Sequence, residues 1–270
     1  MRIQNNISAM NALRNLNTTT QNQESSMEKL SSGYRINRAA DDAAGLAISE
    51  KMRGQISGLD QASRNAQDGI SLIQTAEGAL DETSNILRRM RDLAVQSAND
   101  TNTTDDRAKL QQEVDALAEE VGRIASDTEF NTMTLLSGGF ENKEFHIGAN
   151  EDQNITLSIG DMSAGTLGVS GLSISSQGDA DSAIDTLDSA IDDVSEERAD
   201  LGAVQNRLEH TINNLETTRE NLQASESRIR DTDMAAEMAD MTKSQILSQA
   251  GTAMLAQANQ QSQGVLQLLG

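Results

Sequence analysis

Apolar residues recur every seven positions along two long stretches of this chain. A sustained heptad repeat indicates a helix that buries one face against a partner helix along its whole length. No proline interrupts either stretch, so each predicts an unbroken rod about 65 Å long at about 1.5 Å per residue. Packing the two rods together is the simplest way to bury both seams. The two series are Met52, Leu59, Ala66, Ile73, Leu80, Leu87 and Ala94, and Leu187, Val194, Leu201, Leu208, Leu215, Leu222 and Ile229.

The same reading predicts five helices in all. The rods occupy residues 44–98 and 180–230. A looser 3–4 pattern predicts a helix over 5–32, with a polar stretch at Thr18–Asn22 that breaks the pattern. After a turn at 99–104, a helix over 105–128 is expected, with Thr104 or Asp105 as its N-cap. A last helix is expected over 234–268. The helix over 105–128 carries its own seam of Leu110, Val114, Leu117, Val121 and Ile124.

The heptad pattern of apolar residues is absent from residues 138–178. Eight of the nineteen glycines lie there, together with two alternating runs at 144–147 and 154–159. Alternation on both sides of a turn predicts a short β-hairpin. The expected fold is therefore mainly α, a long antiparallel helical coiled-coil rod with a small β-hairpin region and a terminal helix pair.

Composition argues against a compact globule and against disulfides. The chain has no tryptophan, one tyrosine and three phenylalanines, so the large side chains that usually anchor a spherical core are scarce. It has no cysteine, which excludes disulfides and thiolate metal sites. The N-terminus lacks the continuous apolar stretch of a signal peptide, and no segment reads as a membrane span. These features indicate a cytoplasmic protein, unless it leaves the cell by a route without a cleaved signal.

The charge is strongly negative and unevenly placed. The net charge is −21, yet residues 1–39 hold five basic and two acidic residues, and residues 241–270 hold a single charged residue, Lys243. The acidity therefore belongs to the middle of the chain. It argues against nucleic-acid binding, which needs a positive surface, and favours a soluble, solvent-facing body.

No enzyme signature emerges from the motifs. His146 and His210 lie far apart in sequence, and each is better explained as a solvated or edge residue than as a ligand or base. The paired aspartates do not follow calcium-loop spacing. We therefore expect no catalytic residue, metal site or cofactor. The methionines at 234, 238 and 241 fit a simple helix core better than an adaptable binding face, which remains the alternative.

The two ends of the chain are amphipathic and low in charge compared with its acidic middle. Without strong caps, isolated helices of this kind fray, whereas paired with copies of themselves they bury their apolar stripes. We therefore expect order that develops on assembly. Membrane binding is less favoured, because a surface helix normally carries lysine or arginine on its polar face. The residues expected to drive assembly are Ile3, Ile7, Met10, Leu13, Leu16, Met254, Leu255, Val265, Leu266, Leu268 and Leu269.

Several long motifs closely resemble those of bacterial flagellin, and together they span the chain. They are MRIQNNISAMNALRNLN, LSSGYRINRAADDAAGLAIS, RMRDLAVQSANDTN, FHIGAN and ANQQSQGVLQLL. The resemblance implies a structural subunit that polymerises into the flagellar filament for motility. It also implies that 1–42 with 232–270 form an inner-tube helix pair with its connector, and that 43–231 form the rod domain. Because Gly160 to Gly178 leaves no room for a variable outer domain, a short form is expected.

The resemblance also implies partners and a location. It implies type III export into the extracellular filament, an export chaperone, and contacts with the filament cap and the hook–filament junction proteins. Arg89, Leu93 and Glu113 match positions through which a vertebrate Toll-like receptor recognises the family. Alternatives are a hook–filament junction protein, a soluble coiled-coil adaptor and, more distantly, an enzyme.

Overall fold

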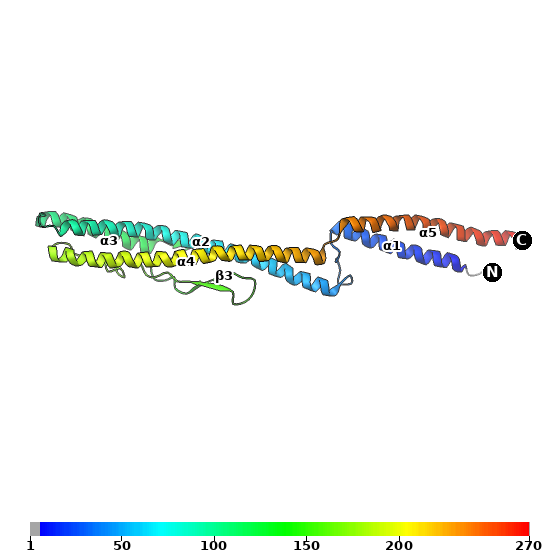
Figure 1. Cartoon of the computed structure of the whole chain (residues 1–270), viewed down its shortest axis with the longest axis horizontal. Helices are drawn as coiled ribbons and strands as arrows, with labels where there is room; N and C mark the ends of the chain where they lie inside the picture. Colours follow the sequence, from blue (N-terminus) through cyan, green and yellow to red (C-terminus); the bar gives the residue numbers. More distant parts are fainter. Residues whose placement is uncertain (1–5, 270) are drawn as a thin grey trace. The chain divides into compact units, whose positions relative to one another are not determined.

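The computed structural model describes residues 6–269, with side chains from 6 to 260, and it is mainly helical as predicted. Figure 1 shows the order of the elements along the chain. The helices differ from the expected ranges by only a few residues at their ends. The elements are α1 Ile7–Ser32, α2 Ala43–Ser97, α3 Thr104–Asp127, β1 Glu129–Phe130, β2 Met133–Thr134, β3 Lys143–His146, β4 Asn154–Leu157, α4 Gln177–Arg230 and α5 Met234–Leu269.

The chain divides into two compact units. The rod unit is Gln55–Glu220, and the terminal unit combines Met1–Gly54 with Asn221–Gly270. The two long helices, α2 and α4, contribute to both units, so the division falls inside helices. Domain boundaries at the connectors, before residue 43 and after residue 231, stay a prediction.

Most of the two heptad series lies in the core of the rod unit. The seam residues of α2 and α4 that belong to this unit are between 0 and 8 % exposed. They pack with α3, whose Val114, Ala118, Val121 and Ala125 are also buried. The buried α2 and α4 seam residues are Leu59, Ala66, Ile73, Leu80, Leu87, Ala94, Leu187, Val194, Leu201, Leu208 and Leu215. Met52, Leu222 and Ile229 belong to the terminal unit, where they are half-buried.

Ion pairs along the rod unit show that α2 and α4 run antiparallel. Asp60 lies 2.6 Å from Arg219, and Asp81 lies 3.0 Å from Arg198. Further along α2, Arg91 pairs with Asp188. As the residue number rises on α2, the partner's number falls on α4. The side chains of these pairs are about a third to a half exposed and contribute little stability individually, but they report the register in which the two seams meet.

The N-cap of α3 is Thr103, not Thr104 or Asp105 as expected. The Thr103 hydroxyl oxygen accepts the backbone N–H of Asp106, and the Asp106 carboxylate accepts the backbone N–H of Thr103, both at 3.3 Å. This is a capping box, which satisfies two helix-end donors at once. It places the cap earlier because the reciprocal bond requires an acidic residue three positions after the cap.

The predicted hairpin is present and lies on α2. Strands β3 and β4 pair antiparallel, with Phe145 opposite Ile155. A Cβ added at Gly69 would lie 3.3 Å from the Phe145 ring, so the glycine allows the hairpin to approach the helix closely. The side chain of Asn65 adds a hydrogen bond to the His146 carbonyl oxygen at 2.9 Å.

Two features of this region differ from the sequence reading. Strands β1 and β2 form a second hairpin that was not predicted, with Asn131 and Thr132 at its turn. The segment after β4, for which the sequence indicated only a glycine-containing loop, packs closely on the rod. Its apolar side chains are buried against the rod, as the exposures of Ile159, Met162, Leu167, Val169 and Ile174 show.

Candidate functional site

Helix α1 is continuous and capped at both ends. The Asn6 side chain accepts the Ala9 backbone N–H, and Gly33 ends the helix at φ 76°, with its own N–H bonded to the Lys29 carbonyl oxygen. The expectation that the termini lack good caps is therefore wrong for α1. The polar stretch at 18–22 does not interrupt the helix. The hydroxyls of three threonines there donate to carbonyl oxygens one turn earlier, so these donors are satisfied within the helix.

Helices α1 and α5 pack side by side within the terminal unit (Figure 1). The least exposed positions on each helix recur at alternating steps of three and four, which is a heptad seam. This seam is built mainly from small or polar side chains, so the periodicity of large apolar residues did not reveal it. On α1 these positions are Ala9, Ala12, Leu16, Thr19, Gln23, Ser26 and Leu30, and on α5 they are Glu237, Met241, Ser244, Ser248, Gly251, Leu255 and Ala258.

The small residues of this seam allow close approach. A Cβ added at Gly251 would lie 3.2 Å from Leu16 Cδ1, and the Asn6 side-chain amide donates to the Ala258 carbonyl oxygen at 2.9 Å. Near the other end, Lys29 Nζ lies 3.9 Å from the Glu237 carboxylate. The contact is therefore specific, but it buries few large apolar groups.

Most of the large apolar side chains described on these helices face away from the seam. Nine of them are between 49 and 66 % exposed. Of the residues expected to drive assembly, Ile7, Met10, Leu13 and Met254 are in this exposed set, whereas Leu16 and Leu255 lie in the seam. Ile3 and the side chains of Val265, Leu266, Leu268 and Leu269 lie outside the described residues. The nine are Ile7, Met10, Leu13, Met27, Met234, Met238, Ile246, Leu247 and Met254, which we call the apolar terminal surface.

The methionines of α5 do not form a simple helix core. Met234 and Met238 are each 49 % exposed, whereas Met241 is half-buried in the seam. A spacing of four and three places all three methionines on one side of α5. It did not show that only Met241 lies close enough to α1 to be partly covered.

Two connectors join the terminal helices to the ends of α2 and α4, and they are bonded to each other. The backbone N–H of Arg35 donates to the Arg230 carbonyl oxygen at 2.7 Å, and that of Thr232 donates to the Gly33 carbonyl oxygen at 3.0 Å. The Arg230 guanidinium lies 4.8 Å from the centre of the Tyr34 ring and 2.7 Å from Glu50. Sequence reading missed this cluster because its members lie almost 200 positions apart.

The N-terminal connector is also held by a local carboxylate. Asp41 accepts the backbone N–H groups of Asn37 and Arg38. These bonds favour the ionised form, and they lower the pKa of Asp41 below its ordinary value. The connector is therefore a bonded turn and not a loose link.

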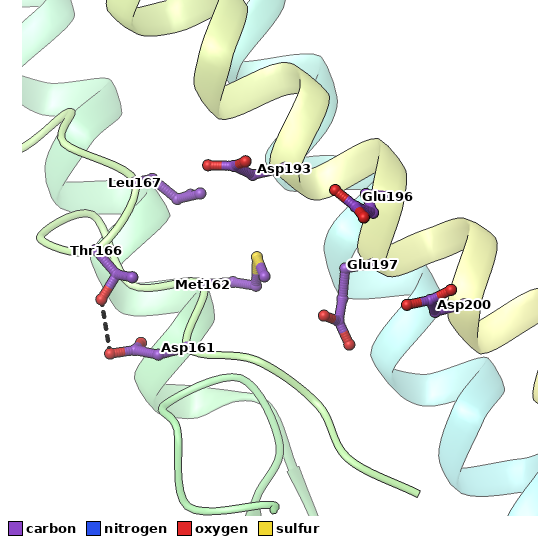
Figure 2. A pocket seen from close by; sticks show the side chains of 8 residues that line it. All are labelled: Asp161, Met162, Thr166, Leu167, Asp193, Glu196, Glu197 and Asp200. Atoms are coloured by element: carbon purple, nitrogen blue, oxygen red, sulfur yellow. Dashed lines mark hydrogen bonds between the residues drawn. The ribbon is translucent and has the colours of Figure 1, made fainter.

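A pocket of about 310 Å³ lies in the rod unit between the loop after β4 and α4 (Figure 2). Asp161 accepts the Thr166 hydroxyl at 2.7 Å and the Ser163 backbone N–H at 3.0 Å, which lowers its pKa. Burial raises the pKa of Glu197 across the pocket, and a hydrogen bond from the Gly160 backbone opposes part of that effect. The pocket holds carboxylates and apolar groups, with no nucleophile–base pair among its lining residues. The lining residues are Asp161, Met162, Thr166, Leu167, Asp193, Glu196, Glu197 and Asp200.

The three residues that match receptor positions differ in their exposure to solvent. Arg89 and Glu113 form an ion pair at 2.6 Å on the rod surface, with about half of each side chain exposed. Leu93 is 1 % exposed, because it points into the core formed with α3 and α4. Its side chain is therefore not presented to a partner in this conformation.

Within the described part of the chain, no group of histidine and acidic residues is arranged to hold a metal ion. His146 Nδ1 lies 2.6 Å from the Asn154 side-chain oxygen across the hairpin, and His210 is exposed on α4. None of the described helices is both long and apolar enough to cross a membrane.

Comparison with known proteins identifies two family regions. Residues 3–141 match the bacterial flagellin N-terminal helical region, and residues 184–269 match the bacterial flagellin C-terminal helical region. The chain is 58 % identical to a flagellin of Halalkalibacterium halodurans and 54 % identical to a flagellin of Bacillus subtilis. It is also 54 % identical to a flagellar filament 33 kDa core protein of Treponema phagedenis. Each of these matches covers 100 % of both chains.

Solved structures give the same picture of the fold. A crystal structure of Bacillus cereus flagellin matches with a TM-score of 0.51 at 35 % identity, and it covers 56 % of this chain and 88 % of that one. A putative flagellar hook-associated protein from Vibrio parahaemolyticus matches with a TM-score of 0.59, covering 71 % of this chain and 100 % of that one. At 15 % identity, that likeness concerns the fold alone. The full-length relatives decide the family: the chain belongs to the bacterial flagellins and is a structural subunit of the extracellular flagellar filament.

Proposed function

We propose that copies of this chain polymerise by covering one another's apolar terminal surface on α1 and α5. The observation that carries the proposal is the exposure of this surface, whose nine large side chains are 49 to 66 % exposed in the single chain. Isolated exposed apolar residues are common on protein surfaces, but nine large ones on one pair of helices mark an interaction site. Removing it from water stabilises an assembly by about 25 cal/mol per Å².

The exposed residues of α5 favour neighbours on more than one side. At about 100° per residue, Met238 and Leu247 project in nearly opposite directions, and Ile246 projects between them. All three are 49 to 61 % exposed. A helix that is apolar around most of its circumference is normally buried inside an assembly. This arrangement suits a helix surrounded by sister molecules in the wall of a tube.

The intrachain seam supports the further proposal that the terminal pair gains order on assembly. Ser26, Ser244, Ser248 and Gly251 occupy seam positions, and such residues bury little apolar area. A helix pair with so small a core is stabilised mostly by what packs around it. Neighbouring copies then supply the apolar burial that the seam lacks.

The same surface supports the proposed partners. In the cell, before export through the flagellar type III apparatus, an export chaperone would shield the apolar side chains of α5. The filament cap and the hook–filament junction proteins would meet the terminal helices at the two ends of the polymer. Recognition by a Toll-like receptor is proposed through Arg89 and Glu113, since both are accessible on the rod surface.

Elongation from filament seeds tests the assembly proposal. We expect Ile246→Asp, which places a charge on the apolar terminal surface, to abolish elongation while the rod unit melts at an unchanged temperature. Val95→Asp is the matched control, because Val95 is an exposed apolar residue of the rod unit. We expect that variant to elongate. Normal growth of Ile246→Asp would contradict the proposal, and failure of the unsubstituted protein to extend seeds would favour the junction role.

A further inference from the structure

The methionines that the structure describes differ widely in exposure, and Met52 and Met241 are intermediate. Six described methionines are 42 to 66 % exposed, and five of these belong to the apolar terminal surface. In the rod unit, Met90 is 0 % exposed and Met162 is 9 % exposed. The five are Met10, Met27, Met234, Met238 and Met254, and the sixth, Met133, lies on β2.

We infer that these five thioethers are an oxidation-sensitive control on assembly. A peroxide that reaches the unassembled chain converts them to sulfoxides, and the sulfoxides block docking of the next copy. The inference rests on the proposed docking of copies through the apolar terminal surface. The oxidant is a hydroperoxide such as hydrogen peroxide, and the modified atom is the methionine sulfur.

The chemistry needs no group beyond the oxidant and the side chain. The sulfur donates an electron pair to one peroxide oxygen, the O–O bond breaks and an S–O bond forms. The departing hydroxide takes up the remaining proton and leaves as water. The sulfur is oxidised by two electrons and the peroxide is reduced by two. Reaction depends on access to the sulfur, which the five exposed side chains provide.

The consequence differs between the two units. A sulfoxide replaces a flexible apolar group by a strongly polar one. At the apolar terminal surface it would be carried into a contact between copies, where the oxygen loses its water. In the rod unit, the core methionines are shielded, so the helical rod stays folded. Oxidation therefore acts on assembly and not on the fold of the subunit.

The test compares oxidised and untreated full-length protein in seeded elongation. Monomer is treated with hydrogen peroxide, the peroxide is removed, and mass spectrometry locates each added oxygen. We expect sulfoxides at the five positions but not at Met90, and a critical concentration for elongation that rises about tenfold or more, which corresponds to a loss of about 1.4 kcal/mol per docked copy. Methionine sulfoxide reductases for both epimers should restore elongation. Elongation at the untreated critical concentration with all five positions oxidised would overturn the inference.

A set of variants assigns the effect to the five residues. Leucine at all five positions removes the oxidisable sulfur while keeping volume and apolarity, so peroxide should not change the critical concentration that this variant shows before treatment. Met133→Leu is the matched control and should remain sensitive. If the five-leucine variant elongates untreated but loses elongation after peroxide, the inference is wrong. Should that variant not elongate at all, reductase rescue of the oxidised natural chain decides the question. Failure of the untreated natural chain to elongate would refute the docking proposal itself. This outcome distinguishes failure of the docking proposal from failure of the oxidation inference.

Discussion

Thr132 holds a backbone conformation that suits glycine better than a β-branched residue. It lies with Asn131 at the turn between β1 and β2, and the two have φ values of 64° and 50°. Two-residue hairpin turns of this kind prefer Asn-Gly, because both central residues have positive φ. We expect Thr132→Gly to stabilise the rod unit by about 0.5–1 kcal/mol in urea unfolding. At Thr128, where φ is −73°, the same change should destabilise, and equal effects at both positions would contradict the strain argument.

Glu197 is a carboxylate whose surroundings disfavour its charge. Burial raises its pKa, and Asp200 and Glu196 add repulsion of like charge. Because the folded-state pKa lies above the unfolded one, the associated stability is fully present below the unfolded pKa and is lost as pH rises through the folded value. Glu197→Gln keeps a carbonyl oxygen for the Gly160 N–H and removes the charge. We expect a higher melting temperature than the natural chain at pH 7, with a difference that narrows below about pH 4. If the difference in melting temperature between Glu197→Gln and the natural chain were the same at pH 7 and below about pH 4, this explanation would be refuted.

At the scale of the elements, α2 and α4 pack together through buried apolar residues near the middle of each helix, and Leu208 is one of them. Leu208 is 0 % exposed, and a Cβ added at Gly69 of α2 would lie 3.4 Å from its Cδ1. An aspartate there would bury an unpaired charge between α2 and α4. We expect Leu208→Asp to cost about 3 kcal/mol or more in thermal unfolding of the rod unit. Leu208→Met keeps the volume and should cost less than about 1.5 kcal/mol. Similar melting of both variants would mean that the two rods do not share this seam.

At the scale of the whole molecule, the two units have unlike cores. The rod unit buries large aliphatic side chains on three helices, whereas the terminal unit has a seam of small and polar residues and an exposed apolar surface. We expect limited proteolysis of the monomer to remove residues from both α1 and α5 and to leave a resistant fragment close to 55–220. In filaments, both terminal helices should be protected. Equal protection of the ends before and after polymerisation would show that the terminal pair is already ordered in the monomer.

The sequence predicted only part of the candidate site. The apolar character of Ile7, Met10, Leu13 and Met254 was visible, and so was the low charge of the ends. The sequence did not show which of these residues face the seam and which face outward. Ser244, Ser248 and Gly251 are not apolar, so the hydrophobic pattern did not mark them as the positions that contact α1. The sequence also did not predict the connector cluster around Arg230, because Tyr34 and Glu50 are distant from Arg230 in sequence and come close only in the folded chain.

The sequence by itself determined the helices and their lengths, because heptad periodicity is a local property that each segment carries in its own residues. It predicted that the two long helices pack together in an antiparallel rod, and the ion pairs between α2 and α4 established that direction. It also determined the family, through long motifs at both ends. Only the tertiary structure decided which face of each terminal helix is left open, that Leu93 is buried while Arg89 and Glu113 are exposed, and that residues 158–176 pack on the rod. These outcomes depend on how closely backbones far apart in sequence approach one another, and side-chain size and hydrogen bonding at the contact set that distance.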